Sequence, residues 1–322
     1  LNGAISEDSP QVAAQLQKVG YQTAVFGKWH LTSQPKGFDT YKVTRGQGSW
    51  YDPVFYTQTG QGYGKKKKRD RVPGEKHQGY CSDVYTDQAL QWLKARDAKK
   101  PFCMMLHFKA PHHSYEYPGR WKDYLKDTLI PEPPSLHEDV EKTSPLLKGV
   151  HTWHMVDKNG YFGRHEKDEE PPMWPHDGSI RSKTSAAYQH MIHKFIRCVA
   201  AIDDNVKRVY DFLEGEGILD DTLIIYTSDQ GYWIGQHNMH DKRLILEESL
   251  KMPFIVRYPK EVKAGKVNDR LGMNIDFGPT MLDFAGVAIP KAMQGASLRP
   301  LLRGEQPKLA THTSRPCRHR PR

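Results

Sequence analysis

The chain has 322 residues, of which 37% are hydrophobic and 26% charged, a composition typical of a globular protein. This length suits one large α/β domain, and no apolar run approaches the roughly 18 residues that a membrane-spanning helix needs. The net charge of +9 is concentrated in two segments, the run at 65–69 and four arginines of the tail, which together hold nine positive charges. We therefore expect no nucleic-acid-binding face, which needs basic residues spread over a surface, and no membrane span.

The first helix–strand unit lies near the start of the chain. Residues 9–19 are predicted to form an amphipathic helix with Ser9 as its N-cap. The apolar and β-branched residues 21–26 are predicted as a strand, which runs directly into Lys28 and His30. The unit therefore ends in cationic and polar side chains.

A second unit follows an irregular segment. Residues 32–80 show little periodicity and are predicted to form a long irregular segment. Irregular segments of this length inside a compact domain usually have a function. A helix is then expected over 82–96, followed by a strongly apolar strand over 102–108. His112 stands just beyond the end of that strand.

The third unit contains the longest predicted helix. Apolar side chains recur every three or four positions over residues 184–214, which indicates an amphipathic helix. His190 and His193 lie on it, and we interpret them as partly exposed residues rather than zinc ligands. The apolar run 222–227 has the length and composition of a buried strand.

Two oxygen donors, Asp229 and Gln230, follow this last strand. Carboxylate and amide oxygens are ligands that Ca²⁺ and Mg²⁺ take, whereas Zn²⁺ prefers His and Cys. A simple turn explains these residues equally well, because Asp and Gly are common in turns. A polar loop with His237 and Lys242 comes next, before another predicted strand at 253–257.

The alternation of helices and strands predicts an α/β fold with a mostly parallel central sheet flanked by helices. In such a sheet the carboxyl ends of the strands meet at one edge, where ligands bind. Six side chains would meet there: Lys28, His30, His112, Asp229, Gln230 and Lys242. Lysines, histidines and a divalent ion suit a sulfate or phosphate ester, because they neutralise its oxygens and can protonate its leaving group.

Three segments resemble the type I sulfatases of the alkaline phosphatase superfamily. They are GYQTAVFGKWHL at 20–31, APHH at 110–113 and TSDQGYWIGQHNMHDK at 227–242. The resemblance covers about residues 9–305. It implies the α/β fold of that family, incomplete at both ends, as one domain over 1–305 followed by an unstructured basic tail over 306–322.

The resemblance also implies an activity, the hydrolysis of a sulfuric ester in a sulfated small molecule or glycan. Asp229 and Gln230 would bind Ca²⁺, with Mg²⁺ as the alternative. Lys28 and Lys242 would bind the sulfate and help to stabilise the nucleophile. Proteins of this family are secreted or periplasmic, although no export signal is present at Leu1.

Three histidines receive roles from the same resemblance. His30 would assist the hydroxyls of the nucleophile, and His112 would bind the sulfate or protonate the leaving oxygen. His237 would contact the substrate.

The nucleophile of the family is a formylglycine made from Cys or Ser in a C/S-x-P-x-R motif. In the family this motif, and a strand that ends in paired aspartates, precede the helix expected at 9–19. We interpret the motif as absent from this chain, because the tail segment 314–318 has a similar composition but is interpreted as having the wrong order. We expect the chain to be a fragment without the nucleophile and with about half of the metal ligands. A phosphoesterase or phosphonate hydrolase of the same superfamily stays an alternative, as does a non-catalytic relative that binds sulfated glycans.

Overall fold

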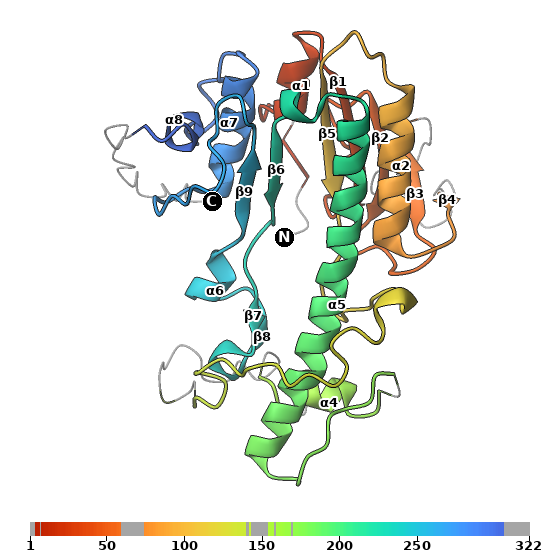
Figure 1. Cartoon of the computed structure of the whole chain (residues 1–322), viewed down its shortest axis with the longest axis vertical. Coiled ribbons are helices and arrows are strands. Elements are labelled where there is room, and N and C mark those ends of the chain that lie inside the picture. Colours follow the sequence, from red (N-terminus) through yellow and green to blue (C-terminus); the bar gives the residue numbers. More distant parts are fainter. Residues whose placement is uncertain are drawn as a thin grey trace, which may run out of the picture.

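The computed structural model describes residues 4–6, 8–58, 74–139, 142, 154–157, 159–168 and 170–305. The lysine-rich run and the basic tail lie outside these ranges. Helix α5 (Ile180–Gly215) runs almost the length of the molecule, from the sheet at one end to the short helix α4 (Tyr161–His165) at the other (Figure 1). It begins at the N-cap Ser179, whose side chain accepts a hydrogen bond from the N–H of Ser182.

The main sheet has five strands in the order β4-β3-β2-β1-β5. Their bounds are Glu75–Lys76, Val54–Thr57, Thr40–Arg45, Gln22–Trp29 and Phe102–His107. The central strand β1 is parallel to both neighbours, and the pairs β2–β3 and β3–β4 are antiparallel. The parallel part of the prediction is confirmed for three strands, and the sheet as a whole is mixed. Strands β2, β3 and β4 come from the segment 32–80, which was predicted to be irregular.

A second, two-stranded sheet pairs β6 (Ile224–Thr227) with β9 (Phe254–Arg257) in antiparallel fashion. Within the described part of the chain no ladder joins it to the main sheet, so the single central sheet predicted from the sequence is divided. Both β5 and β6 are half-buried along their lengths, because each has a strand on one side only. The prediction of a fully buried strand at 222–227 was therefore wrong. A small hairpin, β7 (Trp233–Ile234) with β8 (His240–Asp241), follows β6.

The helices cover the sheets and close the ends. Helix α2 (Cys81–Ala95) packs between β1 and α5. Helix α1 (Val12–Gln17) begins later than predicted, with Gln11 and not Ser9 at its N-cap and no side chain capping it. The other elements are α6 (Glu247–Leu250), α7 (Phe277–Phe284), α8 (Arg299–Leu302) and 3-10 turns at Gly119–Trp121, Leu219–Asp221, Gln236–Asn238 and Asn274–Asp276.

The principal core lies where α5 meets α2 and the loops that follow β5. His190 and His193, expected to be partly exposed, are only 1% and 3% exposed. His190 Nδ1 lies 2.9 Å from the hydroxyl of Tyr161 in α4, and its Nε2 lies 2.9 Å from the carbonyl of Pro171 in a loop. His193 Nε2 lies 3.0 Å from the carbonyl of Leu125 in another loop. These histidines fasten irregular loops to the helix.

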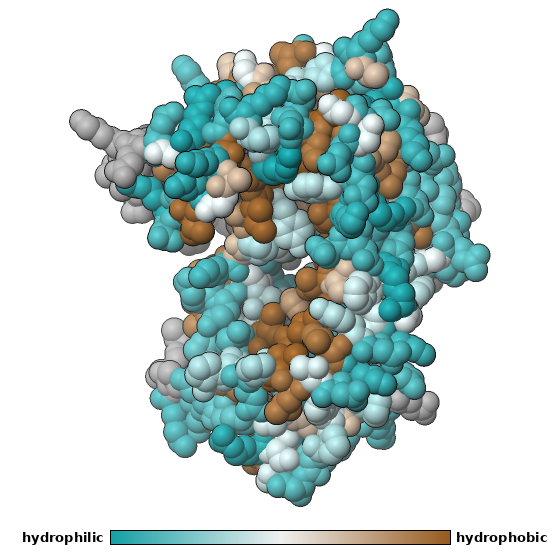
Figure 2. Space-filling model, viewed as in Figure 1, coloured by the Kyte–Doolittle hydropathy of each residue, from teal (hydrophilic) through white to brown (hydrophobic). Residues whose placement is uncertain are grey.

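Apolar side chains also remain on the surface. Figure 2 shows them on both sides of a hollow between the upper and lower parts of one face. Ile255 of β9 is 62% exposed, and Leu250 of α6 is 59% exposed. In the ranges that the structure describes, no helix is both long and apolar enough to cross a membrane.

Gly27 allows β1 and β5 to pair closely. Its φ is +101°, and a Cβ there would lie 2.1 Å from the carbonyl oxygen of His107. Gly20 also has a positive φ, +90°, but its Cβ would meet no atom within 4 Å.

We expect Gly20→Ala to lower the free energy of unfolding by about 1 kcal/mol and Gly27→Ala by about 2–4 kcal/mol, because only Gly27→Ala adds a clash between strands. Urea unfolding measures both, and equal losses would contradict this account of the pairing.

Candidate active site

Strand β1 places the first two candidate residues. Its side chains alternate between faces, so Trp29 packs with Val25 in a buried cluster while Lys28 projects from the other face. Trp29 also lies parallel to the ring of His107, with 6.3 Å between ring centroids. Lys28 is half-buried, and His30 is exposed just beyond the strand.

His112 lies in a turn after β5. Its N–H donates to the carbonyl of Lys109 at 3.1 Å, and its own carbonyl accepts from the N–H of Tyr115 at 3.0 Å. Its Nδ1 lies 2.7 Å from the carbonyl oxygen of His113. Because a carbonyl can only accept, Nδ1 holds the proton and Nε2 of the neutral ring is left with its lone pair.

Asp229 and Gln230 follow β6, with Asp229 exposed and Gln230 half-buried. They offer oxygen donors of the type that Ca²⁺ and Mg²⁺ bind, but only two of the six to eight that Ca²⁺ takes. Among the described residues no group of three or more His, Cys, Asp or Glu side chains could hold a metal ion. The residues present therefore fit a hard cation in kind and not in number.

Lys242 is held in the loop after β8. Its ammonium nitrogen lies 3.1 Å from Oδ1 of Asp241 and 5.2 Å from the ring centroid of Tyr232. The side chains of Lys242 and Asp241 are both largely buried.

His237 is clamped between two carboxylates. Its Nδ1 lies 2.7 Å from Glu138 and its Nε2 lies 3.5 Å from Glu248. Its backbone N–H donates to the hydroxyl of Ser135 at 3.1 Å. These contacts join the loop before α4 to the loop after β6, and the substrate contact expected of His237 stays a prediction.

Electrostatics show which of the expected residues lie together. Burial lowers the pKa of Lys28 to about 8, with Asp229 opposing the shift and Lys242 and Lys109 adding to it. Burial, followed by the charge of Lys28, lowers the pKa of His30. The site therefore joins residues from β1, from the turn after β5 and from the loops after β6.

The pKa of His112 falls to about 3, chiefly through burial and then through the charges of Lys242 and His113, with a small contribution from Lys28. The hydrogen bond from its Nδ1 to the His113 carbonyl opposes this shift. The ring is therefore neutral at pH 7, because it is buried beside positively charged groups.

Lys109 was not among the predicted site residues. It is buried, its ammonium donates to the carbonyls of Gln47 at 2.9 Å and Gly48 at 3.0 Å, and it lies 4.8 Å from the ring centroid of Trp50. It thus fixes the loop between β2 and β3 beside the site. Its position directly after an apolar strand, like that of Lys28 at the end of β1, was the signal that could have found it.

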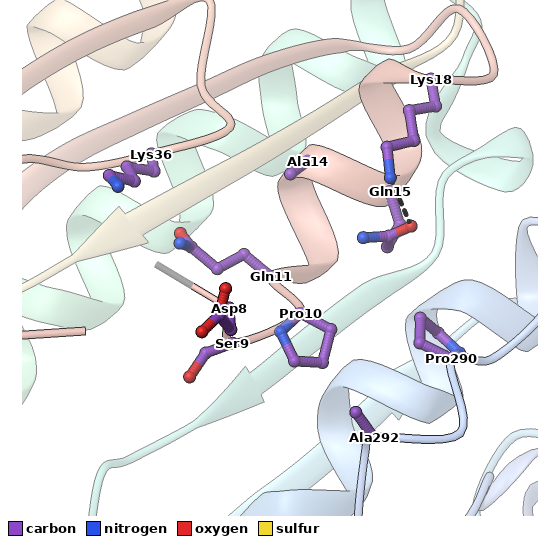
Figure 3. Close-up of a pocket in the computed structure, with 10 residues that line it drawn as sticks. All are labelled: Asp8, Ser9, Pro10, Gln11, Ala14, Gln15, Lys18, Lys36, Pro290 and Ala292. Atoms are coloured by element: carbon purple, nitrogen blue, oxygen red, sulfur yellow. Dashed lines mark hydrogen bonds between the residues drawn. The ribbon is translucent and has the colours of Figure 1, made fainter. Parts of the chain in front are cut away.

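The cavity drawn in Figure 3 lies elsewhere. It has a volume of about 530 Å³ and is lined by residues around α1 together with Pro290 and Ala292. None of the candidate site residues lines it. We place the chemistry at the strand ends, because Lys28, Asp229, Lys242 and His112 influence one another electrostatically there and none of them lines this cavity.

An α/β fold whose parallel strands are followed by cationic side chains is typical of the class of proteins that bind anionic ligands at the strand ends. The model of the sulfatase family matches residues 3–287, and the chain belongs to that family.

Two comparisons give the relationship in more detail. The chain is 37% identical over 326 residues to an N-acetylglucosamine-6-O-sulfatase of Bacteroides thetaiotaomicron, across 90% of this chain and 56% of that protein. A solved protein in complex with its substrate, D-glucosamine-2-N,6-O-disulfate, superposes with a TM-score of 0.80 at 34% identity, across 94% of this chain and 66% of that one. The chain thus spans about half the length of the curated relative.

A phosphonate monoester hydrolase from Silicibacter pomeroyi also superposes, with a TM-score of 0.68 at 23% identity across 96% of this chain and 64% of that one. At that level of identity the likeness shows the fold alone. The family match and the related sulfatases confirm the family predicted from the sequence.

One statement about the nucleophile needs correction. Ser314-Arg315-Pro316-Cys317-Arg318 fits the S-x-P-x-R pattern in order as well as in composition, so the pattern is not missing from the chain. The segment lies outside the described residues, and it follows every candidate site residue in the sequence instead of preceding them. A five-residue pattern with two variable positions has low specificity.

The lowered pKa of Lys28 predicts how anion binding depends on pH. Below about pH 8 the ammonium group of Lys28 is charged. Above that pH Lys28 is mostly neutral, so the folded chain must take up a proton when an anion binds to this residue. Inorganic sulfate should therefore bind more weakly as the pH rises from 7 to 9, with proton uptake visible as a buffer-dependent calorimetric enthalpy. Lys28→Arg, which stays charged, should flatten the dependence. Affinity that is constant up to pH 9.5 in the unaltered chain would contradict the assignment.

Proposed function

We propose that the complete protein containing this chain is a sulfuric ester hydrolase that removes the 6-O-sulfate of a glucosamine-type sugar. The observation that supports this most is the mutual influence of Lys28, His112, Asp229 and Lys242, which indicates one strongly cationic site. The names of the related sulfatase and of the substrate in the related solved complex supply the sugar.

The lysines would bind the sulfate oxygens. One ammonium group comes from strand β1 and the other from the loop after β8. Together they would neutralise the charge that grows on these oxygens as the bond to the leaving group breaks. Lys28, which burial makes easier to deprotonate, gains most from an anionic partner.

His112 would serve the leaving oxygen. Its Nε2 is unprotonated in the neutral ring, so it must take a proton before it can donate one. A bound sulfate offsets the charges of Lys28 and Lys242 and thereby raises the proton affinity of the ring. His30, exposed beside Lys28, is proposed to assist the hydroxyls of the nucleophile.

The family uses a divalent metal and a formylglycine, and when bound these supply positive charge and the attacking hydroxyl. We propose Asp229 and Gln230 as two ligands of Ca²⁺, with Mg²⁺ as the alternative. Because they offer too few donors, no step of the reaction is assigned to the ion. We also propose that the protein is secreted or periplasmic.

A phosphonate or phosphate ester hydrolase is the second candidate, and the fold of the related hydrolase favours it.

The complete protein should hydrolyse N-acetylglucosamine-6-sulfate at least about 100-fold faster than the 6-phosphate. Lys242→Ala should reduce kcat/KM for the sulfate ester by about 100-fold. Faster turnover of the phosphate would favour the second candidate. Tight binding of the sulfated sugar without turnover would favour a non-catalytic glycan-binding protein.

The same preparation identifies the nucleophile. A hydrazide probe labels the formylglycine aldehyde, and peptide mass spectrometry then locates it. We expect labelling in a C/S-x-P-x-R segment that precedes the site residues. Labelling at Ser314 would instead assign the role to the tail.

A further inference from the structure

Two tyrosines join the loops that hold His112 and Lys242. The hydroxyl oxygens of Tyr115 and Tyr232 lie 2.5 Å apart, and their rings meet edge to face with 6.1 Å between centroids. Tyr115 is completely buried, and its N–H donates to the carbonyl of His112 at 3.0 Å. Tyr232 turns its ring toward the ammonium of Lys242, 5.2 Å from the centroid. One hydrogen bond therefore links two segments that are far apart in the sequence.

Helix α5 anchors this pair. Phe195 lies 6.1 Å from the ring centroid of Tyr115 and 6.2 Å from that of Tyr232. The three rings form an aromatic cluster on the side of the long helix. Because α5 also packs against α2 beside the main sheet, the cluster sets both loops in relation to β1 and β5.

The contacts of Lys242 differ in what they fix. Oδ1 of Asp241 lies 3.1 Å from the ammonium nitrogen, so the carboxylate pairs with the charge and can accept one of its N–H groups. The face of Tyr232 attracts the same charge and accepts no strong hydrogen bond. Together they hold the ammonium in place and leave its remaining N–H groups to an anion.

We propose that Tyr232, fixed by its hydrogen bond to Tyr115, is a positioning residue that places the ammonium of Lys242 for the oxyanion. This rests on the proposed function in assigning Lys242 to the oxyanion. Tyr232 itself need not touch the substrate, so its effect must pass through Lys242.

A double-mutant cycle on the 322-residue chain tests this, with inorganic sulfate as the probe and calorimetry as the measurement. Tyr232→Leu should weaken sulfate binding about tenfold, since the ring face is lost. In the Lys242→Ala background the same substitution should change the affinity less than about twofold. Equal losses in both backgrounds, or no loss in the first, would overturn the proposal.

Milder variants keep the test usable if Tyr232→Leu fails to fold. Tyr232→Phe retains the ring and leaves the Tyr115 hydroxyl unpaired, so binding should weaken about threefold, and adding Tyr115→Phe should cause no further loss.

Tyr188→Phe is the matched control. The Tyr188 hydroxyl donates to the carbonyl of Pro131 at a distance of 2.7 Å, and this hydrogen bond lies away from the site. It should lower stability to urea without changing sulfate affinity. If Tyr188→Phe lowered sulfate affinity as much as Tyr232→Phe, the Tyr115–Tyr232 pair would have only a general structural role.

The outcomes separate this proposal from the proposed function. If Lys242→Ala leaves sulfate affinity unchanged, Lys242 is not part of the oxyanion site and the proposed function loses its support. If Lys242→Ala weakens binding and Tyr232→Leu does not, only the positioning role is overturned. Failure of the unaltered chain to bind sulfate would overturn both.

Discussion

The parallel pairing of β1 with β5 is the constraint on which the site depends. Gly27 lies opposite His107 in this ladder, and any side chain larger than hydrogen would meet the carbonyl of that residue. The two strands therefore run close together and end at the same edge. The backbone hydrogen bonds between β1 and β5 bring Lys28 on β1 close to the turn after β5 that contains His112. This placement does not depend on contacts between the side chains.

The cluster that results is costly to form without an anion. Lys242 and Lys109 both lower the pKa of Lys28, and the partial burial of Lys28 and His112 lowers their affinity for protons. Asp229 opposes the shift of Lys28, and Asp241 pairs with Lys242. A tetrahedral oxyanion would satisfy several donors at once, which is why perturbed pKa values in one place indicate a functional site more strongly than any single residue does.

The sequence predicted the α/β fold of the family, and its assignment of the site residues stays a prediction. Polar residues directly after apolar strands are a local signal, and that signal singled out Lys28, His112 and Asp229 as candidates for one edge of the sheet. The division of the sheet is a property of tertiary pairing, which periodicity does not specify. The helix cap expected at Ser9 was wrong because cap preference is weak beside packing, and His190 was placed at the surface because helical spacing does not reveal which loops fold over a face. Tyr232 carried no recognisable pattern, since its role comes from a contact with a loop more than a hundred residues away.

The most direct test of the account is a crystal structure of the chain with selenate, whose anomalous scattering marks the bound oxyanion. The account predicts one selenate within about 3 Å of the ammonium nitrogens of both Lys28 and Lys242, beside the ring of His112. A selenate that touches only one of these lysines, or that lies instead by Lys18 and Lys36 around α1, would contradict the convergence of the strand ends on a single anion.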